Sequence, residues 1–268
     1  MTRPGTAWIW TGGVIVALIA AAAAAAPWLV THDPNAIRLI EALQPPSATH
    51  WLGTDNLGRD LYSRLLFGAR ISLLVGLGAV GVSMLVGTAL GLLAGWYGRW
   101  VDALIMRCVD VMLCFPVFFL LLAVIAIIGQ SLTNIVLIVG LTSWTGVARM
   151  VRAEVLTLRE REFIQAARVM GFGGSRIMWR HLLPNALSPV IVSATLGIGS
   201  AILVESGLSF LGLGVQPPTP SWGNLLTDAK ATLDVAWWQT LFPGIAILLA
   251  VLGFNLLGEG LRERLGRS

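Results

Sequence analysis

The residues of this chain that could do chemistry are concentrated in a polar, arginine-rich break over residues 149–184. From residue 154 to 171 it reads EVLTLREREFIQAARVMG, and HLLPN follows at 181–185. Mixed charge beside a small apolar face is typical of a helix, and Gly171 is placed to cap its C-terminus. A second short helix is expected over residues 175–183, ending before Pro184. Two short helices at a glycine turn predict a compact docking element rather than a plain charged loop.

Catalytic and nucleotide-binding chemistry is poorly represented elsewhere in the chain. A P-loop needs a lysine after its glycines, and the single lysine, Lys230, stands in TDAKAT. The chain therefore cannot hydrolyse ATP by itself. His32 and His50 are assigned to one side of a membrane and His181 to the other, so we expect no histidine cluster, no metal site and no cofactor. A membrane enzyme lacks support, because no acid, base or ligand cluster is apparent.

The elements that position the break are apolar helices. Of the 268 residues, 56% are hydrophobic and 12% are charged, about half the charged fraction of soluble domains. Runs of about 20 apolar residues can cross a bilayer as helices, which satisfy their own backbone hydrogen bonds. The sequence predicts an all-α integral membrane protein, with a retained first span and six transmembrane helices at about 8–30, 71–96, 102–128, 135–151, 188–213 and 237–257.

The distribution of basic residues predicts the orientation, since cytoplasmic segments are enriched in arginine and lysine. With the N-terminus inside, 13 of the 18 basic residues are cytoplasmic, namely Arg3, Arg99, Arg107, Arg149, Arg152, Arg159, Arg161, Arg168, Arg176, Arg180, Arg262, Arg264 and Arg267. Both termini and the break are therefore expected in the cytoplasm. This topology explains the net positive charge without a nucleic acid partner.

Two further patterns concern packing and the outer surface. Gly87, Gly91 and Gly95 recur every four residues and predict a seam against another helix. In the first outer loop, Thr54 and Asp55 are possible caps of an amphipathic helix that carries leucines every four residues to position 65. The chain is thus divided into residues 1–70, with the first span and this surface helix, and a five-helix core over 71–268 that contains the cytoplasmic loop 152–187.

Three sequence blocks resemble a known family. AARVMG at 166–171, with Leu-Pro at 183–184, is similar to the EAA loop of ABC importer permeases. The segments 144–185, 50–64 and 205–223 resemble permeases of the dipeptide/oligopeptide family, DppC/OppC type. The resemblance implies a type I ABC importer permease fold in a bacterial cytoplasmic membrane. Nickel or haem is an alternative cargo to peptides, and a stand-alone secondary carrier or channel is the alternative of another class.

The same resemblance implies partners and site residues. The partners are a DppB/OppB-type permease, two cytosolic ATPase domains that bind ATP and Mg²⁺, an external binding protein and membrane lipid. Coupling to the ATPases is expected at Arg159, Glu162, Phe163, Gln165, Ala166, Ala167, Gly171, Ser175 and Pro184. External docking is expected at Asp55, Arg59, Asp60 and Trp222. Gln165 replaces the usual Glu of the loop, so its salt bridge is replaced by an amide hydrogen bond or by Glu162.

Three charged residues fall at membrane depth and are candidates for the path or a gate. Arg107 and Asp110 are neighbours on one helix face, where a local ion pair is the alternative role. Glu205 lies near the outer end of the fifth span. It either lines the path or braces the turn that follows.

Overall fold

The computed structural model describes residues 4–265, so Arg3 and Arg267 of the charge count lie outside it. Apart from one isolated bridge between Thr54 and Asp60, the regular structure of these residues is helical. The helices are α1 (Pro4–Ala24), α2 (Ala26–Leu29), η1 (Leu39–Glu41), α3 (Leu61–Tyr97), α4 (Arg99–Leu113), α5 (Val117–Ile128), α6 (Leu132–Arg159), α7 (Glu162–Val169), α8 (Gly174–Ile177), η2 (Met178–Leu182), α9 (Leu183–Phe210), α10 (Trp222–Asp228), η3 (Ala229–Thr232) and α11 (Trp238–Leu265).

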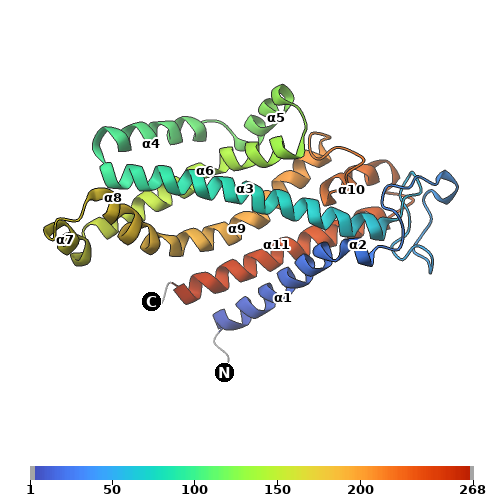
Figure 1. The fold of residues 1–268 in the computed structure, drawn as a ribbon. Coiled ribbons are helices and arrows are strands. Elements are labelled where there is room, and N and C mark those ends of the chain that lie inside the picture. The colour runs from blue at the N-terminus through green and yellow to red at the C-terminus, as the bar shows by residue number, and fades with distance from the viewer. Residues whose placement is uncertain (1–3, 266–268) are drawn as a thin grey trace.

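The long helices form an elongated antiparallel bundle (Figure 1). Among the described residues, five helices are long and apolar enough to cross a membrane, and α4 with α5 makes a sixth if that bent pair is one span. The chain reverses direction at each span, so α7 and α8 lie at the same end of the bundle as the start of α1 and the end of α11 (Figure 1). The loop over residues 30–60 and α10 lie at the opposite end.

The predicted third span is not one straight helix. α4 and α5 meet at an angle of 87°, with Pro116 as the residue immediately before α5. The proline ring and its missing N–H oppose continuation of the helix. Pro189 and Pro243, by contrast, lie inside α9 and α11. Those two helices pack against each other in the bundle, whereas most side chains of α4 and α5 are exposed.

The predicted glycine seam is confirmed, and its partner is α6. A Cβ atom on Gly91 would lie 2.5 Å from the Ala148 carbonyl oxygen, and one on Gly87 would lie 2.6 Å from Cβ of Val147. Gly95 meets Val155 in the same way, at 2.8 Å. These contacts allow α3 and α6 to lie backbone to backbone through the centre of the bundle.

The prediction that a second short helix ends before Pro184 is wrong. α8 continues through the π-helical turn η2 directly into α9, giving an unbroken helix over 174–210. Pro184 lies in the first turn of α9, where a residue without an N–H leaves one hydrogen bond unmade. The wider π turn just before it is the local adjustment that lets the helix continue.

The separate amphipathic helix predicted after Thr54 and Asp55 is also not formed. The helix begins only at Leu61, and Asp60 is its cap, accepting a 2.8 Å hydrogen bond from the Ser63 N–H. Residues 53–60 form a turn instead, with positive φ at Gly53 and Gly58. The division proposed at residue 70 therefore falls inside α3.

Candidate coupling and translocation sites

α7 forms a small projection at one end of the bundle. Ile164 and Ala167 are its buried residues, and they pack with Leu158 and Ile177. The helix ends as predicted at Gly171, whose φ is +79°. The Phe172 N–H donates to the Ala167 carbonyl at 3.1 Å, which is the closing bond of a Schellman motif.

The outward face of α7 is apolar and open. Phe163, Val169 and Met170 are 44%, 88% and 64% exposed, and Ala166 is exposed beside them. Ala167 is only 2% exposed, so the prediction that it contacts a partner is wrong; it anchors α7 to its own chain. The other predicted coupling residues with exposed positions are Glu162, Gln165, Gly171, Ser175 and Pro184.

Arg159 and Gln165 tie the projection to the bundle. The Arg159 guanidinium donates to the carbonyls of Gly95 and Trp96, at 3.1 and 3.3 Å, and so closes the end of α3. The Gln165 amide Nε2 donates to the Arg159 carbonyl at 3.1 Å. Of the two replacements considered for the missing glutamate, the structure shows the amide hydrogen bond. A carboxylate has no proton to donate there.

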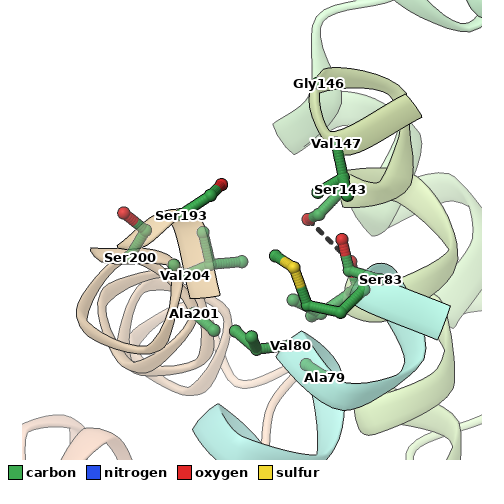
Figure 2. A pocket seen from close by; sticks show the side chains of 13 residues that line it. Ala79, Val80, Ser83, Ser143, Gly146, Val147, Ser193, Ser200, Ala201 and Val204 are labelled. Carbon is green, nitrogen blue, oxygen red and sulfur yellow. Dashed lines mark hydrogen bonds between the residues drawn. The ribbon is translucent and has the colours of Figure 1, made fainter. Parts of the chain in front are cut away.

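A pocket of about 180 Å³ lies among α3, α6 and α9 (Figure 2). Figure 2 shows Ser83 and Ser143 on one side of it and Ser193 and Ser200 on the other. Its lining is small, apolar or hydroxylic and contains no charged side chain: Ala79, Val80, Ser83, Met84, Val139, Ser143, Gly146, Val147, Ser193, Gly197, Ser200, Ala201 and Val204.

A second pocket, of about 720 Å³, shares Ser193 with the first and extends toward the α7 end. Glu154 and Arg262 are the charged residues that line it. The two pockets follow the same faces of α6 and α9, because Met150 and Ser193 continue the helical rows of Val147 and Gly197. The two pockets therefore follow one another from the middle of the bundle to its α7 end, and we call them together the groove.

The predicted charged residues at membrane depth line neither pocket. Asp110 is exposed and pairs with Arg149 of α6 at 2.8 Å. The local pair of Arg107 with Asp110 is therefore not formed, and Arg107 is exposed. The pairing across helices attaches α4 to α6, as does a bidentate contact between Arg152 and Asp102.

Glu205 is fully buried at the other end of α9. Its carboxylate accepts hydrogen bonds from the hydroxyls of Ser209 and Ser221, at 2.7 and 2.9 Å. Each hydroxyl in turn accepts from a backbone N–H, of Val215 and Asn224 respectively, both at 3.2 Å. These contacts brace the turn after α9, through hydroxyl groups rather than directly through the backbone.

Four charged side chains form a paired network at the same end. The Arg59 guanidinium donates to Asp55 at 2.6 Å and to Asp228 at 2.9 Å. Arg64 lies 3.6 Å from Asp55 and 3.5 Å from Asp228. Burial raises the pKa of Asp228, while the charges of Arg64 and Arg59 act to lower it. The network joins the turn before α3 to the end of α10.

The predicted external docking residues belong to this interior. Asp55, Arg59, Asp60 and Trp222 are at most 6% exposed, so the prediction that they offer a contact surface is wrong. The indole of Trp222 donates to the Leu65 carbonyl at 3.1 Å. Sequence reasoning missed the partners Arg64 and Asp228. The latter lies 169 residues from Arg59 along the chain, and no local pattern marks such a pair.

This fold of antiparallel spans around a pocket without charged side chains is that of a transport permease. The chain belongs to the family of binding-protein-dependent transport system inner membrane components, whose model matches residues 87–268. It is a multi-pass membrane component that works with other transporter subunits.

The relatives that match most of the chain are named as permeases of particular transport systems. It is 46% identical over 257 residues to the dipeptide transport system permease protein DppC of Alkalihalophilus pseudofirmus, covering 96% of this chain and 83% of that one. It is 46% identical to the di/tripeptide permease DppC of Pseudomonas aeruginosa, with coverage of 95% and 86%. The glutathione permease GsiD of Pectobacterium atrosepticum is 44% identical, with coverage of 94% and 84%. Within the family this chain is of the DppC type.

Solved structures show the same fold. A chain of the MetNI methionine ABC transporter in an inward-facing conformation superposes with a TM-score of 0.61 at 18% identity, covering 76% of this chain and 97% of that one. A chain of an amino acid ABC transporter gives 0.57 at 15% identity, with coverage of 76% and 94%. The fold is that of type I ABC importer permeases, as the sequence predicted.

Proposed function

We propose that this chain forms half of the transmembrane path of an ATP-driven importer of dipeptides or oligopeptides. A second, homologous permease completes the path, two cytosolic ATPase domains bind α7, and an external binding protein delivers the peptide. ATP and Mg²⁺ are bound by the ATPase subunits. The membrane is the bacterial cytoplasmic membrane, with the α7 end and both termini in the cytoplasm.

The observation that carries the proposal is the exposed apolar face of α7. Phe163, Val169 and Met170 extend from a capped helix at a bundle end where the arginines are concentrated. Apolar side chains gathered on such an element favour a protein contact. A secondary carrier or channel does not need this projection.

The groove supports a peptide cargo. Its pocket among α3, α6 and α9 offers hydroxyls of Ser143, Ser193 and Ser200, which can donate to or accept from a peptide backbone. Without charged side chains there, the pocket does not select one side chain of the cargo. The names of the relatives likewise favour peptides over nickel or haem.

The mechanism we propose is alternating access. Closure of the ATPase dimer moves α7, and α7 moves the long helix that begins at Gly174. Arg159 and Gln165 keep α7 attached to α3 and α6 during this motion, because their hydrogen bonds join the three helices.

Co-purification of the ATPase subunits in mild detergent tests the proposal. Val169→Arg places a charge on the apolar face of α7 and should abolish ATPase retention and ATP-dependent uptake of a labelled dipeptide. Val235→Arg is the matched control, since Val235 is 67% exposed at the opposite end of the bundle; it should retain the ATPases. Retention of the ATPases by Val169→Arg, with uptake intact, would contradict the proposed docking role.

A further inference from the structure

Three side chains with metal-ligating atoms meet in the loop before α3. The rings of His32 and His50 lie 4.6 Å apart between centroids. Together with Asp60, they offer ligand atoms that all lie within 4.8 Å of one another. The sequence predicted no histidine cluster, because His181 was assigned to the other side of the membrane; His32 and His50 nevertheless come together on their own side.

Asp60 has one carboxylate oxygen available for a ligand. Its Oδ2 accepts from the Ser63 N–H at 2.8 Å and from the Ser63 hydroxyl at 2.7 Å. Its Oδ1 faces the two imidazoles instead, 2.8 Å from Nδ1 of His50 and 3.7 Å from Nδ1 of His32. The helix cap and the imidazole-facing position therefore use different oxygens of one carboxylate.

A second carboxylate, that of Glu41, lies on the other side of the His50 ring. Nε2 of His50 lies 3.5 Å from Oε2 of Glu41. Nδ1 of His50 donates to Oδ1 of Asp60 at 2.8 Å, because the carboxylate can only accept. A metal ion bound at Nδ1 would take the place of that proton, and the ring proton would then lie on Nε2, on the side of Glu41. A histidine that binds a metal through one nitrogen and a carboxylate through the other is the usual arrangement of such sites.

A small cavity lies at the cluster. Its volume is about 10 Å³, and its lining includes His32, His50, Asp60 and Glu41. That volume is close to the minimum for one water molecule or ion. Arg38 also lines the cavity, but its guanidinium is half-exposed and pairs with Glu41 at 3.4 Å, so its charge is balanced outside the ligand triad.

We propose that His32, His50 and Asp60 bind Zn²⁺. Two imidazoles and one carboxylate are ligands that suit zinc, with a water in the fourth position. The three ligands come from separate segments of the loop, and Asp60 also caps α3. The bound ion would thus fasten the loop to the first turn of α3, beside but apart from the groove.

Metal binding by the tag-free, full-length chain in detergent tests this proposal. After equilibrium dialysis against zinc chloride, the unmodified chain should retain one zinc per chain by elemental analysis. His32→Gln should weaken binding at least about tenfold, and Glu41→Gln by about tenfold, because it weakens the contact that orients His50. His181→Gln is the matched control, because it removes the remaining one of the three histidines and should leave binding unchanged.

A measurement without variants keeps the test independent of folding. Co²⁺ added to the unmodified chain should give visible d–d bands of a low-coordinate nitrogen–oxygen site, and Zn²⁺ should remove them. Failure to retain one zinc per chain, absence of those bands, or equal binding by His32→Gln would each overturn the proposal.

Discussion

The two ends of the bundle differ in whether their charged side chains are buried or exposed. At the loop end, Asp55, Arg59 and Arg64 are buried and paired with one another. At the α7 end the charged side chains are mostly exposed, and the projection is anchored by Ile164 and Ala167. Buried ion pairs tolerate little rearrangement, since loss of one partner leaves the other as an unpaired buried charge. One end is therefore built to keep its shape, and the other to present a surface.

The largest effect is expected from breaking the buried network. Asp55→Asn removes the charge that faces Arg59 at 2.6 Å and Arg64 at 3.6 Å. It should lower the free energy of unfolding by about 3–5 kcal/mol, measured by denaturation in mixed micelles. Asp33→Asn, at an exposed aspartate of the same loop, should cost less than about 1 kcal/mol. Equal effects of the two variants would remove the contrast between the ends.

The glycine seam tests the rigid connection between the ends. Gly91→Val forces side-chain atoms into the Ala148 backbone, 2.5 Å from where a Cβ would lie. Overpacking of this kind should cost about 1–3 kcal/mol in the same assay. Gly81→Val is the control on the same helix, because nothing lies within 4 Å of its Cβ position. A seam that tolerates Gly91→Val as well as Gly81→Val would not be tightly packed.

At the α7 end, a smaller and local effect is expected. Gly171→Ala places a side chain at a φ of +79°, which costs roughly 1–2 kcal/mol. The amides of α7 should exchange hydrogen about tenfold faster, since about 1.4 kcal/mol corresponds to a factor of ten. Gly173→Ala, where φ is −60°, should leave exchange nearly unchanged. An effect extending to α3 would mean that α7 unfolds with the whole bundle.

The smallest effect is expected at Gln165. Gln165→Glu removes the donor to the Arg159 carbonyl at 3.1 Å and should destabilise α7 by about 0.5–1.5 kcal/mol. Hydrogen exchange of the α7 amides reports this loss. Gln165→Ala, which lacks the donor without adding a charge, should lose no more than the glutamate variant. If the α7 amides of Gln165→Glu exchanged as slowly as in the unmodified chain, the hydrogen bond from the Gln165 side chain would not be what holds α7.

Local features of the sequence predicted local features of the structure. The Gly171 cap and the seam at Gly87, Gly91 and Gly95 follow from residue type and spacing. Glycine alone adopts positive φ without steric cost, and glycines on one helix face let a second helix approach closely. The break at Pro116 did not follow, because the chain also keeps Pro189 and Pro243 inside helices. What differs is the packing around each proline, and an apolar run does not reveal it.

Ion pairs between residues far apart in the chain could not be predicted from the sequence. Asp55 and Arg59 were predicted to form part of an external docking surface, since a polar outer loop is normally solvated. Their burial depends on Arg64 and on Asp228, which only the folded chain brings together. The same is true of His32, His50 and Asp60, whose ligand atoms converge through loop closure rather than through a motif.

The unbroken helix from Gly174 to Phe210 connects the two ends of the bundle mechanically. Its 37 residues extend about 55 Å at 1.5 Å per residue. A tilt of about 10° around its midpoint displaces each tip by roughly 5 Å, in opposite directions. The Ser221 hydroxyl, which lies outside this helix, donates to Glu205 at 2.9 Å, and the displacement exceeds that distance. In the proposed mechanism, a push beside α7 would therefore reach the contact between Ser221 and Glu205 as a displacement large enough to break it.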